Sequence, residues 1–336
     1  MSLYSAIDLH SDNNFIVIID NNDSILFQRR LPNDLGTVLS VLEPYKGGLQ
    51  GVAVESTFNW YWLVDGLIEA GYTTRLVNTA KVKQYSGLKH TEDRYDAYWL
   101  AHLMRLGILP TGYIYPREQR AVRDLLRKRR QLVNHRTIHV LSIQNQYWRN
   151  TGIKLKGDYI KRSNDYLGEF EDSNIQLALV SNYEIMQALD EQIRRIETSV
   201  KQQVKLRPEY ELLLSVDGIG YILALTIMLE TGEISRFKEV GNYASYCRCV
   251  ESKHTSNSKK KGEGNAKNGN RYLAWAYIEA ANFAKRFSAK AKRFHQRKKA
   301  KTSNVVATKA LAHKLARACY YIIRDQVPFD ENKTFG

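Results

Sequence analysis

Four carboxylates near the start of the chain have the chemistry that metal-assisted phosphoryl transfer needs. Asp8 lies within one short apolar segment and Glu55 ends another, whereas Asp93 and Asp96 stand three residues apart in a helix-favouring segment. Residues three apart share one face of a helix, so both side chains can reach one site. Because clustered carboxylates repel one another, such a set persists chiefly when divalent cations neutralise it, and hard oxygen ligands favour Mg²⁺ or Mn²⁺. Two such ions about 4 Å apart would clamp the attacking and leaving oxygens of a phosphodiester.

Each of these acids also has an ordinary structural interpretation. An Asp at a strand end is commonly a turn or cap residue, and Asp93 suits a helix N-cap with Asp96 favouring the dipole of the first turn. The apolar flanks of Asp8 and Glu55 argue against merely solvated carboxylates, which strand interiors seldom host. We therefore interpret all four as one site, at once catalytic and metal-binding.

A second candidate centre is the polar segment 251–270, in which hydroxyls stand among lysines and glycines. A serine that attacks phosphorus forms a covalent phosphoserine link, which conserves the energy of the broken strand for rejoining. Stretches of Ser, Asn, Lys and Gly are more often flexible solvated loops, and composition alone favours a loop here. His254 is interpreted as a phosphate or structural contact. The candidate hydroxyls are those of Ser252, Thr255, Ser256 and Ser258.

The charge of the chain predicts a polyanionic partner. Among 336 residues, Lys and Arg number 50 against 35 Asp and Glu, a formal charge of +15, and nucleic acid is the first candidate. In a neutral protein the basic run Arg127-Lys128-Arg129-Arg130 would be a solvated helix face, but this background favours phosphate contact. Segment 283–317 alternates aromatic and cationic residues, as basic helices that track a phosphate backbone do.

Three further patterns limit the alternatives. The turn Asp217-Gly218-Ile219-Gly220 precedes an apolar helix and could hold a phosphate on backbone N–H groups, or simply permit a tight interhelical turn. No apolar run could span a bilayer and residues 1–20 lack a leader pattern, which predicts a cytoplasmic protein with no membrane partner. Cys247, Cys249 and Cys319 lack zinc-site spacing and are predicted to be reduced packing residues.

Periodicity predicts the elements that position these residues. Three β-rich stretches separated by Asp/Asn/Ser turns predict an antiparallel meander, and the strands and helices then alternate. This order predicts a mixed sheet covered by helices, as in a ribonuclease H-like domain, whose first and fourth strands are neighbours and so bring the four acids together. The expected strands are 3–9, 15–19, 24–30, 49–54 and 73–77, and the expected helices are 35–42, 61–70 and 94–106.

The fold class is thus α/β followed by all-α, in three parts. Residues 1–110 form the mixed-sheet domain, 111–206 a long helical connector and 207–330 a mainly helical domain. The connector has long charged helix-favouring segments, which predict a coiled coil or a hairpin that packs against another protomer.

Five motifs in this order resemble the DEDD transposases of the insertion-sequence-110 family, which combine a RuvC-like domain with a C-terminal transposase domain. The resemblance implies that Asp8, Glu55, Asp93 and Asp96 form a Mg²⁺-binding tetrad. It also implies a nucleophilic serine five positions after a residue matched here by Glu251, which selects Ser256. Glu251 replaces a common proline and Asn257 a common glycine, so Ser252, Thr255 and Ser258 stay as alternatives. The motifs are Ala6-Ile7-Asp8, Val54-Glu55-Ser56-Thr57 with Tyr61, Asp93-Arg94-Tyr95-Asp96-Ala97, Ser215-Val216-Asp217-Gly218-Ile219-Gly220 and Lys267-Asn268-Gly269-Asn270-Arg271-Tyr272-Leu273.

The resemblance further implies partners. Members of the family use a noncoding guide RNA that pairs with donor and target DNA, and they work as dimers that join into tetramers, with each active site composed from two protomers. The basic composition fits a protein that holds more than one duplex while base pairing selects the sequence.

Three functions therefore stand at this point. The leading hypothesis is a recombinase that cuts and rejoins DNA through phosphoserine. The alternative is a RuvC-like metal-dependent nuclease or invertase in which water is the nucleophile. A third is a noncatalytic RNA- or DNA-binding protein.

Overall fold

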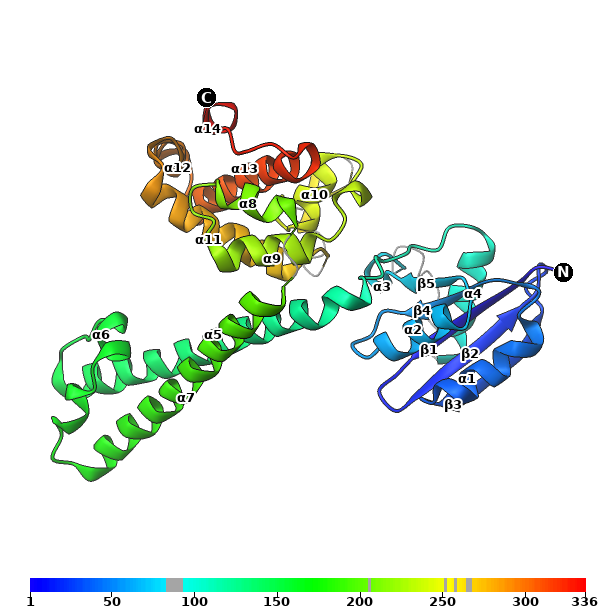
Figure 1. Cartoon of the computed structure of the whole chain (residues 1–336), viewed down its shortest axis with the longest axis horizontal. Coiled ribbons are helices and arrows are strands. Elements are labelled where there is room, and N and C mark those ends of the chain that lie inside the picture. Colours follow the sequence, from blue (N-terminus) through cyan, green and yellow to red (C-terminus); the bar gives the residue numbers. More distant parts are fainter. Residues whose placement is uncertain (83–92, 205–206, 251–252, 257–258, 264–267) are drawn as a thin grey trace. The chain divides into compact units, whose positions relative to one another are not determined.

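The computed structural model describes residues 1–82, 93–204, 207–250, 253–256, 259–263 and 268–336 (Figure 1). For residues 93–94, 253–256 and 259–263 it describes the backbone. The chain divides into two compact units, Met1–Arg117 and Glu118–Gly336.

A five-stranded sheet with the strand order β3-β2-β1-β4-β5 organises the first unit. The first three strands form an antiparallel meander, because their connections are short turns. β4 runs parallel to β1 and β5 runs parallel to β4. The expected adjacency of the first and fourth strands is confirmed by the register Ala6↔Ala53 and Ile7↔Val54. The strands are β1 (Leu3–Leu9), β2 (Asn13–Ile19), β3 (Ile25–Pro32), β4 (Leu49–Glu55) and β5 (Thr74–Val77).

Helices cover both faces of this sheet, because alternate residues of each buried strand point to opposite sides. Ile7 and Val54 face α1 and α2, whereas Ala6 and Ala53 face α4. The small alanines leave room for α4, whose Ala97 and Ala101 pack on that face. The helices are α1 (Leu35–Leu42), α2 (Tyr61–Glu69), α3 (Thr79–Val82) and α4 (Asp93–Arg105), with a 3-10 turn at Glu43–Tyr45.

Two long antiparallel helices, α5 (Arg117–Thr151) and α7 (Ser173–Gln203), form a hairpin in the second unit (Figure 1). Ion pairs fix their register: Arg129 pairs with Glu197 at 2.6 Å, and Arg136 pairs with Asp190. At the tip, apolar residues from both helices enclose the short α6 (Gly157–Arg162) and a 3-10 turn at Asp165–Gly168. The extended helices predicted from the charged segments are therefore present.

The rest of the second unit is a helical assembly around one core. Gly218 has φ 94° and approaches α11 so closely that a Cβ there would lie 2.5 Å from the Ala280 carbonyl oxygen. The Gly-x-Gly turn is therefore a tight interhelical turn at Gly218, whereas a Cβ on Gly220 would meet open space. The helices are α8 (Pro208–Leu214), α9 (Tyr221–Thr231), α10 (Val240–Tyr246), α11 (Arg271–Phe287), α12 (Ala289–Lys301), α13 (Asn304–Asp325) and α14 (Glu331–Phe335), with a 3-10 turn at Ile234–Arg236.

A two-stranded antiparallel hairpin interrupts the helices, formed by β6 (Lys253–Ser256) and β7 (Lys259–Glu263). The expectation of a flexible loop is wrong for these residues. Strand pairing uses backbone N–H and C=O groups that every non-proline residue carries, so a polar segment without apolar alternation can still form a ladder.

Cys247, Cys249 and Cys319 are free and buried, which confirms their predicted role as packing residues. Each helix in the described part of the chain is too short or too polar to cross a membrane.

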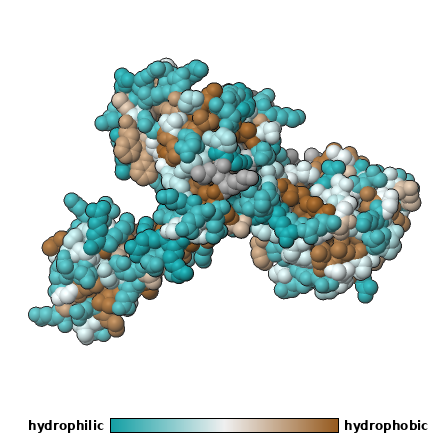
Figure 2. Space-filling model, in the orientation of Figure 1, coloured by the Kyte–Doolittle hydropathy of each residue, from teal (hydrophilic) through white to brown (hydrophobic). Residues whose placement is uncertain are grey.

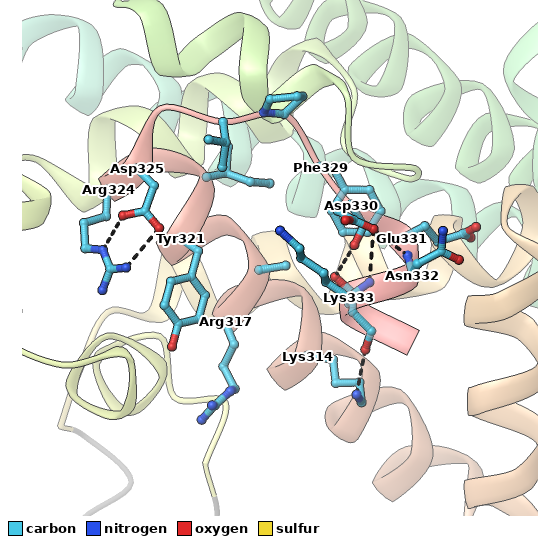
Figure 3. A pocket seen from close by; sticks show the side chains of 15 residues that line it. Lys314, Arg317, Tyr321, Arg324, Asp325, Phe329, Asp330, Glu331, Asn332 and Lys333 are labelled. Atoms are coloured by element: carbon cyan, nitrogen blue, oxygen red, sulfur yellow. Dashed lines mark hydrogen bonds and ion pairs between the residues drawn. The ribbon is translucent and has the colours of Figure 1, made fainter. Parts of the chain in front are cut away.

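The C-terminal segment 327–336 folds back over α13 (Figure 3). Lys314 donates from Nζ to the Thr334 carbonyl at 2.7 Å, and Asp330 caps α14 by accepting from the Asn332 N–H at 2.8 Å. A cavity of about 1140 Å³ separates parts of this segment from α13. These contacts make α14 part of the second unit.

Candidate active site

The carboxyl groups of Asp8 and Glu55 meet on the α4 face of the sheet. Asp8 follows Ala6 by two residues on β1 and Glu55 follows Ala53 by two on β4, so the paired strands deliver both acids to one side. Their side chains are hydrogen-bonded to each other. Asp8 is only 2% exposed and Glu55 is half-buried. Burial, the hydrogen bond with Asp8 and the Asp8 charge raise the pKa of Glu55 to about 8.

Asp96 joins this pair from the first turn of α4. Its side chain is exposed, yet its charge lies near enough to contribute to the raised pKa of Glu55. Asp93 is the first residue of the same helix, one turn before Asp96, and its side chain lies outside what the structure describes. The structure thus joins the side chains of Asp8 and Glu55 and places the charge of Asp96 near Glu55, and one shared site for all four acids stays a prediction. Among the described side chains, no three acidic, histidine or cysteine groups lie close enough together to hold a metal ion.

His10 also belongs to this site, and it is not among the residues predicted from the sequence. Its Nε2 lies 3.1 Å from Oδ2 of Asp8, and its carbonyl oxygen accepts from Asn59 Nδ2 at 2.9 Å and Asn33 Nδ2 at 3.0 Å. The signal was available, since His10 follows Asp8 by two positions and alternate residues of an extended segment share a face. At this ion-pair distance the His10 ring can fix the orientation of the Asp8 carboxylate.

The donor set fits a hard divalent cation in its chemistry. Carboxylate oxygens are the ligands that Mg²⁺ and Mn²⁺ prefer. A hydrogen bond between two carboxyls holds a proton that a cation would displace, because both groups must be ionised to act as ligands. Asp8 and Glu55 could therefore exchange their shared proton for a metal ion.

Ser256 is the last residue of β6, and its backbone pairs with Lys259 in β7. It belongs to the second unit, whereas Asp8, Glu55 and Asp96 belong to the first. Thr255 lies beside Ser256 on β6 and His254 pairs with Gly262. Ser252 and Ser258 lie outside the described residues. Thr255 and Ser256 are thus the last two residues of β6.

A buried carboxylate, Glu230, anchors the chain segment that follows this hairpin. Asn270 donates from Nδ2 to Glu230 at 2.7 Å, and its Oδ1 accepts from the Tyr272 and Leu273 N–H groups at the start of α11. The preceding Gly269 has φ 85°, and a Cβ there would lie 2.5 Å from the Tyr246 carbonyl oxygen. The Asn268-Gly269-Asn270 motif is therefore a structural anchor as well as a family signature.

Arg127 completes this network. Its Nε and Nη2 donate to the two carboxylate oxygens of Glu230 at 2.6 and 2.8 Å, and Glu230 is 3% exposed. Arg129 is likewise paired, with Glu197. Arg127 and Arg129 thus each have a carboxylate partner within the second unit, and phosphate contact by the basic run stays a prediction.

Comparison with known proteins identifies relatives of both units. Residues 6–146 match a family model of the DEDD domain of IS110 elements, described as "Transposase", and residues 210–296 match one described as "Transposase IS116/IS110/IS902 family". A probable family 20 transposase of Pseudomonas aeruginosa is 24% identical over 296 residues, which cover 81% of this chain and 83% of the relative. The transposase for insertion sequence element IS1111A of Coxiella burnetii is 25% identical over 228 residues, which cover 66% of this chain and 62% of the relative.

Proposed function

Because the chain belongs to the insertion-sequence-110 family of transposases, we propose that it cuts and rejoins DNA through a covalent bond between Ser256 and a DNA phosphate. The observation that carries the proposal is the hydrogen-bonded pair of Asp8 and Glu55, with the charge of Asp96 beside it. Such a pair suits the task of holding Mg²⁺ or Mn²⁺, and Asp93 on the same helix would add the fourth ligand.

The reaction conserves the number of phosphoester bonds. The Ser256 hydroxyl attacks phosphorus, an Oγ–P bond forms, the P–O bond to one DNA end breaks, and the hydroxyl proton passes to the departing DNA oxygen. In rejoining, a hydroxyl of another DNA end attacks the phosphoserine and Ser256 recovers its proton. A divalent cation held by Asp8, Glu55, Asp93 and Asp96 would supply Lewis acidity at a phosphate oxygen. Asp8 would be oriented for this task by His10.

We propose a RuvC-like, ribonuclease H-like identity for the first unit. The antiparallel meander, the parallel β4 and β5 and the acids on one face of the sheet support it. In this assignment residues 1–110 carry the carboxylates, 111–206 connect, and 207–330 carry the serine.

A homo-oligomer is the proposed working form. On the tip half of α5, Ile138, Leu141, Asn145 and Trp148 follow a three-four-three spacing, which is that of a coiled-coil seam. Ile138 is 62% exposed and Leu141 and Trp148 are each 50% exposed. Figure 2 shows apolar side chains interspersed with hydrophilic ones on this hairpin. A dimer, and a tetramer on DNA, would cover this stripe and could combine the acids of one protomer with Ser256 of another.

A noncoding guide RNA is the second proposed partner, beside donor and target DNA. The excess of 50 basic over 35 acidic residues supports a protein that binds several polyanions. Sequencing the nucleic acid that copurifies with the full chain tests this proposal. A single structured RNA species is the expected result, and purification with only random fragments would contradict it.

Covalent trapping tests the reaction itself. Wild-type protein with Mg²⁺ and DNA that spans the ends of its own element should yield a protein–DNA adduct on a denaturing gel, and peptide mapping should place the DNA on Ser256. Ser256→Ala should abolish the adduct, whereas Ser181→Ala, which removes a hydroxyl from α7, should not.

The alternative nuclease is favoured by one observation, the contact of His10 with Asp8, because a histidine beside a carboxylate can accept a proton from water. Cleaved ends without any adduct, in wild type and in Ser256→Ala alike, would support that alternative and reject the phosphoserine.

A further inference from the structure

A groove of about 600 Å³ runs between α5 and α11 in the second unit, and the function proposed above does not use it. Cations and aromatic rings line it from both helices. The lining residues that matter here are Arg127, Lys128 and Arg130 from α5, and Arg271, Tyr272 and Trp275 from α11.

Arg127 has a structural role in this groove. Its charge is neutralised by Glu230, and its guanidinium lies 4.5 Å from the centroid of the Tyr272 ring. Asp124, the acidic residue among those that line the groove, lies 3.6 Å from the same guanidinium. Arg127 is therefore paired with both Asp124 and Glu230. The remaining cations determine the net charge of the groove.

Arg130 differs from its neighbours in the basic run. Its guanidinium lies 4.1 Å from the centroid of the Trp275 ring, and within the described part of the chain no carboxylate or carbonyl accepts a hydrogen bond from it. A guanidinium has five N–H donors in a flat array that matches two oxygens of a phosphate, and an aromatic ring beneath it fixes its orientation. The Nε1 atom of Trp275 is also buried without a partner among the described residues. The charge of Glu279 acts on Arg130 without a hydrogen bond, so the groove offers an oriented cation whose N–H donors are not bound by a carboxylate of the described residues.

Lys128 and Arg271 add exposed positive charge at the rim. Lys128 donates from Nζ to the neutral Gln131 at 3.2 Å, and Arg271 donates to the Tyr272 hydroxyl at 2.9 Å. Neither contact neutralises the charge. A bound phosphodiester would thus face Arg130, Lys128 and Arg271. Clustered Arg and Lys side chains of this kind bind the phosphates of nucleic-acid backbones.

The groove and the chain segment after the Ser256 hairpin are held by the same buried carboxylate. Asn270 immediately precedes Arg271 and is bound to Glu230, the same carboxylate that holds Arg127. One buried group therefore fixes both the wall of the groove and the segment that follows β7. This connection favours DNA as the occupant, because DNA is the substrate of the proposed serine.

We propose that the groove between α5 and α11 binds a backbone phosphate of the DNA strand that Ser256 attacks, with Arg130 as its principal contact. The choice of strand rests on the proposed function. Phosphate binding in the groove is argued from the lining residues alone and does not depend on that function.

Binding is measured in the Ser256→Ala background, so that no covalent step contributes. Fluorescence anisotropy of a duplex from the end of the element is followed over a series of salt concentrations. Arg130→Gln should weaken binding about tenfold and make the slope of log K against log salt shallower by about 0.9, the value for one phosphate contact. Arg271→Gln, at an exposed site where folding is not at risk, should also weaken binding and make the salt slope shallower. Arg195→Gln removes an equal charge from an exposed position on α7 and should change neither quantity.

A second readout reports the position of the phosphate. DNA binding should change the tryptophan fluorescence of the full chain, and Trp275→Phe should remove most of that change. Unchanged affinity and salt slope in both Arg130→Gln and Arg271→Gln would overturn the proposal, as would a loss confined to an RNA duplex of the same sequence. An adduct that survives Ser256→Ala would instead reject the serine assignment while the groove measurements still stand.

Discussion

The side chain of Glu55 is hydrogen-bonded to that of Asp8, and neighbouring parallel strands deliver the two carboxyls to one face of the sheet. In water both groups would be ionised at neutral pH. In the folded chain Glu55 retains a proton up to about pH 8, so the pair carries a proton that a cation can replace.

The stability of the metal-free protein should therefore depend on pH through Glu55. Its pKa is about 8 in the folded chain against an ordinary 4.5, so the contribution of protonated Glu55 is fully present below pH 4.5 and is lost as pH rises toward 8. Thermal unfolding with a chelator should show wild type losing stability relative to Glu55→Gln between pH 5 and 8, on the order of 1 kcal/mol per pH unit at most. Parallel pH profiles for the two proteins would contradict the assignment.

Added Mg²⁺ should raise the unfolding temperature of the full chain, because a ligand that binds the folded state alone stabilises it. Protons compete for the same oxygens, so the increase should be larger at pH 8 than at pH 6. Asp8→Asn and Asp96→Asn should each reduce it, whereas Asp12→Asn, at an exposed position of the same unit, should leave it intact. An equal increase in all four proteins would show that Mg²⁺ acts elsewhere.

His10→Ala should lower the rate of strand cleavage at fixed Mg²⁺ by about tenfold to a hundredfold, because a ligand without its orienting partner binds metal less well. Higher Mg²⁺ should restore part of the rate, and DNA affinity should stay the same. Cleavage assays across a Mg²⁺ titration check this. A rate loss that no Mg²⁺ concentration relieves would indicate that His10 has another role.

The two glycines of the Gly-x-Gly turn should differ in their sensitivity to the same change. Gly218→Ala places a Cβ 2.5 Å from backbone atoms of Ala280 and Ala284 at a φ of 94°, so we expect a loss of about 3 kcal/mol or more in stability. Gly220→Ala meets open space and should change stability by less than about 1 kcal/mol. Urea unfolding of both variants measures the difference, and similar losses would refute the close approach of α11.

The elements of the first unit could be predicted because most of its strands are apolar runs that end at short polar turns. The segment 35–42 was expected to be helical and is α1, and the segment 3–9 was expected to be a strand and is β1. The adjacency of β1 and β4, and with it the meeting of Asp8 with Glu55, followed from the same order.

Other features have no local signal. The β6–β7 hairpin lacks apolar alternation, and its pairing depends on backbone groups that every residue carries. Arg127 meets Glu230 across 103 positions and Asn270 meets it across 40, separations that no periodicity records. A basic run therefore resembled a phosphate surface although two of its members are ion-paired inside the protein.

The burial of Glu230 between Arg127 and Asn270 limits which substitutions homologues can accept at these positions. A charge left alone in a protein interior costs about 3–5 kcal/mol, so replacing one partner should be tolerated only when the other is replaced as well. In an alignment of homologues, the positions of Arg127 and Glu230 should therefore covary. Lineages that have lost the acid should also have lost the arginine.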